Sequence, residues 1–266
     1  MVDAHAELDF LVRSENRVTV LSLLARRRYS ERELVETTAM SKTTVNRILE
    51  DFTERGWIEK TDEAYTTTRF GDVLADDYER FRESMDLASR LGPYRHLLPM
   101  EEMGFDLRLL TDAKVTDPDR LDTLQSVDRW TELIRQADPV RFLANTANEP
   151  IIRTTRNAIV EDDTAHESVF TPALYDYIRK RPGLCEMFRE MLREGASFYR
   201  AADGTDMPWF IALYDDLVGV GGFDESGTVQ TGFESDAEPV FEWAEGTFES
   251  HRVDATPLTV EDFPVE

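Results

Sequence analysis

The segment at residues 14–71 carries the pattern that most restricts how this chain can fold. Three short stretches with apolar residues at helical spacing follow one another, and each starts near a residue that favours a helix N-terminus. Ser30 and Glu33 have the spacing of a capping box, in which each side chain satisfies a backbone donor of the other. About three residues, 38–40, separate the second stretch from the third. The segment therefore predicts a helix-turn-helix.

The third stretch, SKTTVNRILEDFTERG at residues 41–56, has two chemically different faces. Val45, Ile48, Leu49 and Phe52 occupy positions i, i+3, i+4 and i+7, so we expect them to pack into a core. The expected N-cap and the outward polar residues of the N-terminal half are Ser41, Lys42, Thr43, Thr44, Asn46 and Arg47. An amphipathic helix with a merely hydrated polar face is the alternative interpretation of this stretch alone.

Residues 57–68, WIEKTDEAYTTT, have the pattern of a strand, a tight polar turn and a second strand. The turn is acidic at Asp62 and Glu63, so any phosphate contacts of this hairpin are expected from Lys60 and Arg69. Helices followed by such a hairpin, with the phrases SKTTVNRILEDFTERGWIEK and YTTTRFGDVLA, resemble the winged helix-turn-helix of archaeal and bacterial transcriptional regulators. The resemblance implies double-stranded DNA as the partner.

The net charge of −24, from 54 acidic and 30 basic residues, opposes DNA binding at low salt, because it repels the phosphate backbone. The basic residues comprise 26 Arg and 4 Lys, and this acidic, lysine-poor composition resembles that of proteins from extreme halophiles. At about 1 M salt the Debye length falls to roughly 3 Å, so repulsion between the chain and DNA is almost fully screened. Residues 12–60 moreover hold ten basic and eight acidic residues, a local charge of +2.

Other features of the sequence limit the kind of protein this is. The single cysteine, Cys185, excludes an internal disulfide framework, and its apolar neighbours indicate a buried thiol. The N-terminus has no signal-peptide pattern, and no apolar run reaches about 18 residues. We therefore expect a soluble cytoplasmic protein without a membrane partner.

We expect a winged helix-turn-helix domain at residues 1–70, a connector at 71–104 and an α/β effector-binding domain at 105–266. Residues 70–91 have apolar residues near helical spacing, which predicts a long helix, and such helices in winged regulators often pair across a dimer axis. Pro93, Pro99 and Gly104 mark a domain boundary after this helix. A homodimer is therefore a hypothesis.

Helical and strand patterns alternate in the C-terminal part and predict an α/β sandwich, so that the chain as a whole is α+β. The expected helices are 123–136, 149–160, 172–179, 183–194 and 237–253, and the expected strands are 140–144, 166–170, 196–201, 209–216, 217–223 and 228–235. This order, with the phrases FDLRLLTDAKVT and FESDAEPVFEWAEGTFESHRVDATPL, resembles the Fil-type methanogenesis-regulator family and, more distantly, the TrmB sugar-sensing regulators. The resemblance implies an effector-sensing domain.

Arginine binds planar anions through paired donors, so a small anionic metabolite is the candidate effector. The candidate ligands for it are Arg153, Arg156, Tyr199 and Arg200. Ordinary surface ion pairing is the alternative, because arginine is the commonest cation of this chain.

Three further motifs bear on catalysis or metal binding. No histidine has a lysine two positions later, as a phospholipase D-type phosphodiesterase would need. The run VGVGGF at 218–223 alternates like a buried strand and lacks a nucleotide-loop pattern. EDDTAHE at 161–167 could hold a cation but is typical of a hydrated acidic loop. We therefore expect no catalytic residue, metal or cofactor; a protein-interaction adaptor and a DNA-binding head fused to an enzyme remain the alternatives.

Overall fold

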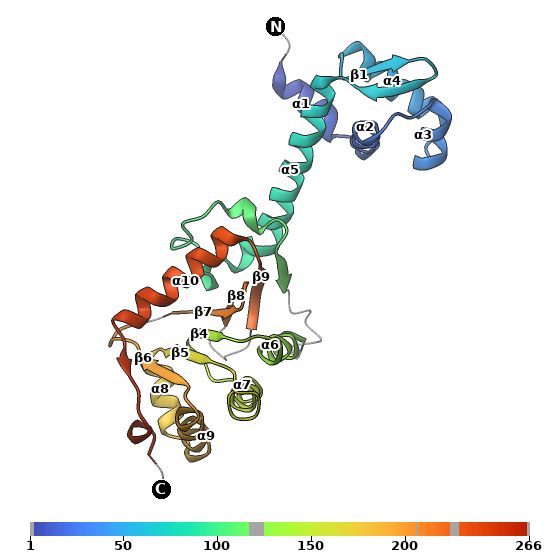
Figure 1. Ribbon diagram of the computed structural model, residues 1–266. Helices are drawn as coiled ribbons and strands as arrows, with labels where there is room; N and C mark the ends of the chain where they lie inside the picture. Colours follow the sequence, from blue (N-terminus) through green and yellow to red (C-terminus); the bar gives the residue numbers. More distant parts are fainter. Residues whose placement is uncertain (1–2, 117–124, 206, 224–228, 265–266) are drawn as a thin grey trace. The chain divides into compact units, whose positions relative to one another are not determined.

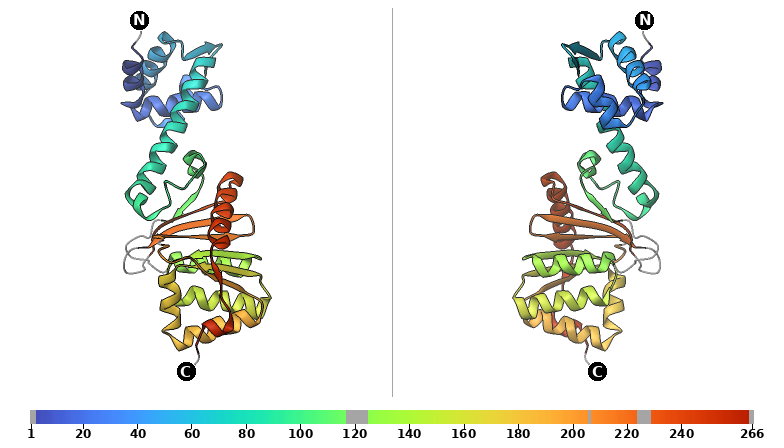
Figure 2. Two further views of the ribbon diagram at one scale, coloured as in Figure 1. Left: turned by 90° about the vertical axis from the view of Figure 1, so that its left-hand side faces the viewer. Right: turned by 90° about the vertical axis from the view of Figure 1, so that its right-hand side faces the viewer.

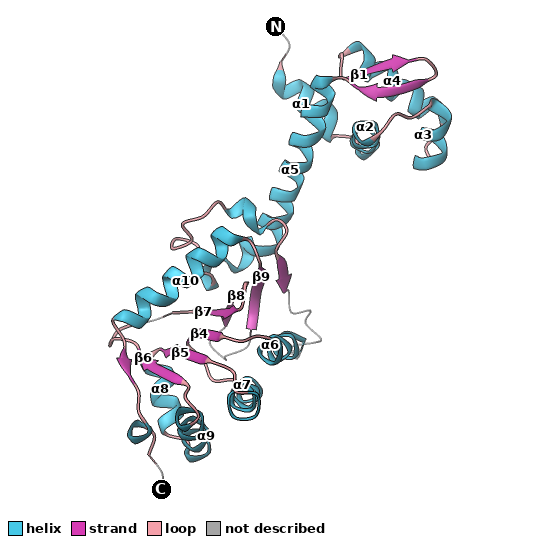
Figure 3. Ribbon diagram, viewed as in Figure 1, coloured by secondary structure: helices cyan, strands magenta, loops and turns pink. Residues whose placement is uncertain are grey.

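The computed structural model describes residues 3–116, 125–205, 207–223 and 229–264 (Figure 1). By their internal contacts the residues divide into two compact units, Met1–Met85 and Asp86–Glu266. Helices and strands both contribute to the chain, which makes it α+β as the sequence predicts (Figure 3). Among the described residues, no helix is long and apolar enough to cross a membrane.

The first unit contains the predicted helix-turn-helix and hairpin. Its elements are α1 (Ala4–Val12), α2 (Glu15–Arg26), α3 (Glu31–Thr38), α4 (Lys42–Glu54), β1 (Ile58–Thr61), β2 (Ala64–Thr67) and most of α5 (Arg69–Leu91). The capping box at α3 forms as expected, with the Ser30 side chain accepting from the Glu33 backbone and the reverse. Gly56, at φ 69°, provides the left-handed turn between α4 and β1.

Helix α1 was not predicted, because its apolar residues gain their partners only in the folded unit. Phe10 lies 6.3 Å from the ring of Phe52 and 5.8 Å from that of Trp57, measured between ring centroids. The guanidinium of Arg55 lies 3.7 Å from the centroid of Phe10, and Arg55 also pairs with Glu7 at 2.8 Å. These contacts attach α1 to the C-terminal end of α4 and to Trp57, which precedes β1.

The second unit is built on a mixed eight-stranded sheet with the order β10-β6-β5-β4-β7-β8-β9-β3. Its strands are β3 (Lys114–Thr116), β4 (Val140–Ala144), β5 (His166–Phe170), β6 (Ser197–Arg200), β7 (Trp209–Tyr214), β8 (Leu217–Phe223), β9 (Val229–Ser235) and β10 (Thr256–Pro257). Strands β4, β5 and β6 are parallel, and the remaining pairs are antiparallel. All the strands expected from the sequence are present, with residue 228 of the expected strand 228–235 lying outside the described residues. The edge strands β3 and β10 are too short to leave a pattern.

Helices cover both faces of this sheet, which gives the second unit three layers (Figures 1 and 2). One face packs against α6 (Gln125–Gln136), α7 (Glu149–Asp162), α8 (Pro172–Arg179) and α9 (Pro182–Arg193). The other face packs against α10 (Glu238–Val253), whose Val240, Ala244 and Phe248 are fully buried. The predicted α/β sandwich is therefore present, with residues 123 and 124 of the expected helix 123–136 lying outside the described residues.

The segment that follows α5 belongs to the second unit and is not an exposed linker. Residues 92–97 form a 3-10 helix, and a second one spans Leu107–Leu110. Leu91, Leu98 and Met103 are buried in the core under α10, so the chain divides within α5 and not at the expected boundary of residues 92–104. Pro93, one of the residues that suggested a boundary, instead lies at the change from α-helix to 3-10 helix.

Strand β8 confirms the interpretation of VGVGGF as a closely packed buried strand. Val218 and Val220 are fully buried, and the glycines that follow each of them, Gly219 and Gly221, lie against large side chains. A methyl group at Gly219 would overlap the ring of Trp130, and one at Gly221 would overlap the ring of Phe210. The absent side chains thus make room for aromatic rings on the face covered by α6 and α7.

Candidate functional sites: an exposed helix face and a buried cavity

Helix α4 has the two faces that the sequence predicts. Val45, Ile48, Leu49 and Phe52 are at most 2% exposed and form the centre of the first unit's core. Ser41 is the N-cap, and its Oγ accepts a hydrogen bond from the Thr44 backbone N at 3.2 Å. On the outward side Lys42, Thr43 and Arg47 are exposed, while Thr44 and Asn46 are half-buried. The N-terminal half of α4 therefore presents hydrogen-bonding groups to solvent.

One carboxylate of α3 engages two of these candidate DNA-reading residues. Lys42 Nζ lies 3.1 Å from Glu31 Oε1. In the amide orientation that its surroundings require, Asn46 Nδ2 donates to Glu31 Oε2 at 3.1 Å and to Oε1 at 3.3 Å. Sequence reasoning missed Glu31, because the contact crosses the turn between two helices and has no fixed spacing. The interaction keeps Lys42 and Asn46 on the side of α4 that faces α3.

Several cations of the first unit have no carboxylate partner among the described residues: Arg26, Arg28, Arg47, Lys60 and Arg69. All five are exposed. Lys60 Nζ lies 5.4 Å from the ring centroid of Tyr65 in the hairpin. Arg28 precedes Tyr29, whose backbone bridges to Tyr65, so the run ARRR at 25–28 leads directly to the hairpin. This run is visible in the sequence, but its place beside the hairpin follows only from the bridge between Tyr29 and Tyr65.

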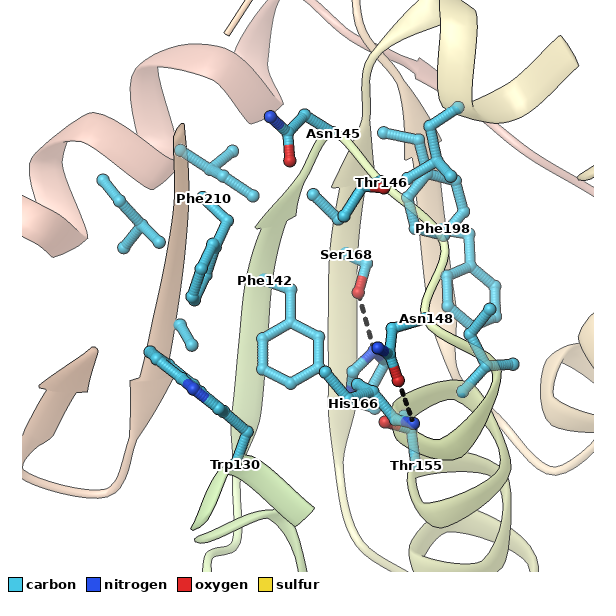
Figure 4. A pocket seen from close by; sticks show the side chains of 18 of the residues that line it. Trp130, Phe142, Asn145, Thr146, Asn148, Thr155, His166, Ser168, Phe198 and Phe210 are labelled. Atoms are coloured by element: carbon cyan, nitrogen blue, oxygen red, sulfur yellow. Dashed lines mark hydrogen bonds between the residues drawn. The ribbon is translucent and has the colours of Figure 1, made fainter. Parts of the chain in front are cut away.

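The second unit contains a cavity of about 90 Å³ between the sheet and helices α6–α9 (Figure 4). Strands β4, β5 and β7 supply Phe142, His166 and Phe210, and α6 supplies Trp130. The rings of Trp130 and Phe210 meet edge to face with 4.5 Å between their centroids. No Asp, Glu, Lys or Arg of the described residues lines the cavity.

Buried polar groups point to a recognition role for this cavity. His166 is 5% exposed, and its Nε2 lies 2.7 Å from Ser168 Oγ. Burial lowers the pKa of His166 to about 3, so the imidazole is neutral at neutral pH. Its Nδ1 has no hydrogen-bond partner among the described residues, and the same holds for Trp130 Nε1, Thr155 Oγ1 and Asn145 Oδ1. Such buried orphan groups are rare in folded proteins and call for a partner.

Both units match known protein families. Residues 5–90 match the HVO_A0261 N-terminal domain, and residues 123–254 match the middle domain of the methanogenesis regulatory protein FilR1. The chain therefore combines an HVO_A0261-type N-terminal domain with a FilR1-type middle domain. These two matches support a role in transcription regulation. No curated protein matches the sequence.

Solved structures resemble this chain at low similarity. TrmBL2, described as an archaeal chromatin protein with a novel mode of DNA binding, is 12% identical over 91% of this chain and 92% of its own, with a TM-score of 0.40. The phospholipase D family member Nuc from Salmonella typhimurium is 10% identical over 56% of this chain and 99% of its own, with a TM-score of 0.43. These similarities are too low to assign a function.

The four residues expected to bind an anionic effector do not line the cavity of this FilR1-type domain. Arg153 pairs with Glu149, and Arg156 pairs with both Glu190 and Glu161. Tyr199 and Arg200 are neighbours on β6, so their side chains point to opposite faces of the sheet. Arg200 pairs with Asp203. The arginines thus form the surface ion pairs that were the alternative interpretation.

The acidic segment EDDTAHE does not form a cluster either. Its Asp162 and Asp163 are exposed at the end of α7, whereas His166 is buried and faces the cavity. No group of three His, Cys, Asp or Glu residues in the described ranges is placed to hold a metal ion.

Proposed function

We propose that this FilR1-type protein is a sequence-specific DNA-binding transcription regulator whose second unit senses a small molecule. The observation that carries the proposal is the division of α4: one face is the centre of a core, and the other presents hydrogen-bond donors to solvent. Arg47 on that outer face is exposed and has no carboxylate partner among the described residues, although the chain holds 54 acidic residues. A strongly acidic protein that keeps such cations unpaired has a surface suited to phosphates and base edges.

The N-terminal half of α4 is the part that would enter the major groove. Asn46 offers the paired donor and acceptor that match adenine, and Arg47 offers the paired donors that match guanine. Lys42, Thr43 and Thr44 would contact bases or nearby phosphates, while Lys60 and Arg69 would hold the backbone. Glu50 and Glu54 lie one to two turns further along α4, so a docking pose led by the N-terminus keeps them away from the phosphates.

The test is footprinting of genomic fragments at high KCl concentration with the full-length protein. Arg47→Ala should lose about 10- to 100-fold in specific affinity, because a bidentate contact to a base contributes about 1–3 kcal/mol. Arg13→Ala is the matched control, since Arg13 is exposed but already paired with Asp9 at 3.4 Å. Protection by Arg47→Ala equal to that by Arg13→Ala would remove Arg47 from the reading set. If no sequence is protected but a stable protein partner is captured, the adaptor role would replace the proposal.

We further propose that α5 pairs with its copy in a homodimer. Phe70, Val73 and Phe81 are 78%, 57% and 56% exposed, and their spacing places them within a sector of about 80° on the helix. Exposed apolar stripes of this kind favour burial against a partner. A two-fold arrangement would also present two α4 helices to a palindromic site.

Sedimentation velocity of two charge-matched variants tests the dimer. Phe81→Lys and Glu83→Gln each raise the net charge by one, and both residues are exposed on α5. Phe81→Lys should shift the protein toward monomer, with a dimer dissociation constant at least ten times that of Glu83→Gln. A wild-type protein that sediments as a monomer at micromolar concentration would contradict the dimer.

We propose a sensing role and not a catalytic one for the second unit. His166 and Ser168 are in hydrogen-bond contact, as in a nucleophile and its base. However, no carboxylate of the described residues orients the imidazole, since His166 Nδ1 has no partner. A histidine that titrates at about pH 3 is also a weak proton acceptor at neutral pH.

A further inference from the structure

We infer that the cavity between the sheet and helices α6–α9 binds a small, uncharged aromatic molecule that both donates and accepts hydrogen bonds. The inference that this molecule is the effector rests on the proposed sensing function. Binding itself does not depend on DNA and can be measured without it.

The absence of charged side chains among the described residues of the wall makes an ionic ligand unfavourable in this cavity. Transfer of an ionised group into a site of low polarity is costly unless an opposite charge meets it there. None of the described residues that line the cavity is Asp, Glu, Lys or Arg, and the one titratable base among them, His166, is neutral. The nearby arginines Arg153 and Arg156 are already paired with carboxylates outside it. A neutral ligand is therefore favoured.

The shape and composition of the wall favour an aromatic ring. Trp130, Phe142, Phe210 and Tyr214 all contribute to the wall, and the contacts between their rings are edge to face, at 4.5 Å for Trp130 with Phe210 and 6.0 Å for Phe142 with Tyr214. A further ring can extend such an arrangement with favourable edge contacts. The volume of about 90 Å³ is smaller than that of a cavity of about 150 Å³ that is known to bind benzene, so the ligand is limited to a single small ring.

The unpartnered polar atoms determine what this ring must carry. The described residues include six buried side-chain N or O atoms without a hydrogen-bond partner, and four of these belong to residues that line the cavity. Trp130 Nε1 can only donate, whereas Asn145 Oδ1 can only accept. Thr155 Oγ1 and His166 Nδ1 can do either, depending on rotamer and tautomer. Trp130, Thr155 and His166 are at most 5% exposed, so bulk water does not satisfy them. A hydroxyl or carboxamide group on the ligand would supply both kinds of partner.

Pyrazole and imidazole provide a matched pair of probes, because both are five-membered aromatic rings of the same size, and at pH 5.5 pyrazole is neutral whereas imidazole is mostly protonated. We expect isothermal titration of the full-length protein at pH 5.5, without DNA, to show one pyrazole site per chain and at least tenfold weaker binding of imidazole. Equal or tighter binding of imidazole would overturn the neutral-ligand inference. If pyrazole does not bind, the cavity holds only water and the inference fails.

Two variants locate the site. Ala212→Leu places three extra carbons in the cavity and should weaken pyrazole binding at least tenfold, while Ala202→Leu makes the same change at an exposed position and should leave it unaltered. Trp130→Phe keeps a ring but removes the indole donor, and should weaken binding about threefold to tenfold. If Ala212→Leu does not fold, Trp130→Phe decides. Unchanged affinity in both variants would place the probe elsewhere. A failed footprint would leave these results intact, so the two proposals fail separately.

Discussion

The outward face of α4 and the cavity under the sheet differ in the kind of partner that each can bind. The face of α4 is exposed and cationic, and a carboxylate from α3 engages part of it. The cavity is buried and uncharged, and its polar atoms lack partners within the protein. An exposed cation can exchange a carboxylate for a phosphate or base at small cost, because water solvates both states. A buried neutral group gains more from a fitting ligand, because nothing else satisfies it.

The largest effect that separates the two regions is expected from a methyl group at Gly219. Gly219→Ala would force the Trp130 ring away from β8, and overpacking of this kind costs typically 1–3 kcal/mol. We expect urea denaturation, followed by hydrogen exchange of peptides from the second unit, to show this loss. Exchange in the first unit and DNA affinity should stay unchanged.

Gly246→Ala is the control for that substitution. Gly246 lies in α10, and a methyl group there meets no atom within 4 Å. Alanine is the better helix former by about 1 kcal/mol, so this variant should be slightly stabilised. If Gly219→Ala were equally stable, the close packing of β8 on Trp130 would be refuted.

The buried imidazole predicts a pH dependence confined to the second unit. The pKa of His166 is about 3 in the folded protein and about 6.5 when exposed, so between these values only the unfolded chain takes up the proton. The stability contributed by the neutral buried form is therefore complete above pH 6.5 and falls as the pH drops toward 3. Between pH 7 and 5.5, wild-type protein should lose about 1 kcal/mol more than His166→Gln.

Denaturation curves at the two pH values measure this difference. His5→Gln removes an exposed imidazole from the first unit and should follow the wild-type pH dependence. Parallel losses in the wild type and His166→Gln would mean that the imidazole is solvated, which would also weaken the case for an uncharged cavity.

How well each region could be foreseen depended on how local its determinants are. The buried residues of α4, its N-cap and the capping box of α3 follow from spacing along one helix, and all were predicted correctly. The strands β4 and β5 also have the predicted bounds, because each is a short apolar run. Contacts between elements left no such signal. Glu31 meets Asn46 across a turn, and Trp130, Thr155 and His166 reach the cavity from three different elements.

The arginines of the second unit also show that residue type does not predict contacts between elements. Their residue type suggested an anion site, but Arg156 lies between Glu161 and Glu190, and Arg153 pairs one helical turn away with Glu149. In a chain with 54 acidic residues, most arginines find a carboxylate within reach. Residue type alone could not distinguish a ligand contact from a surface ion pair.

The smallest expected effect tests whether Glu31 restrains the reading face of α4. Glu31→Gln removes the charge that engages Lys42 and Asn46 and should tighten specific DNA binding about twofold to fivefold, since exposed pairs of this kind contribute less than about 1 kcal/mol. Glu36→Gln makes the same charge change on the same helix, where the carboxylate pairs with Arg32 at 2.8 Å. At high salt the long-range repulsion between either carboxylate and DNA is screened, so only a local contact can distinguish the two variants. Fluorescence anisotropy with a footprinted site should therefore give tighter binding for Glu31→Gln than for Glu36→Gln. Equal affinities would mean either that Asn46 and Lys42 exchange Glu31 for DNA at no cost or that they do not reach the DNA. The double variant Glu31→Gln with Asn46→Ala separates these outcomes. If Asn46 contacts a base, the double variant should bind DNA more weakly than Glu31→Gln alone.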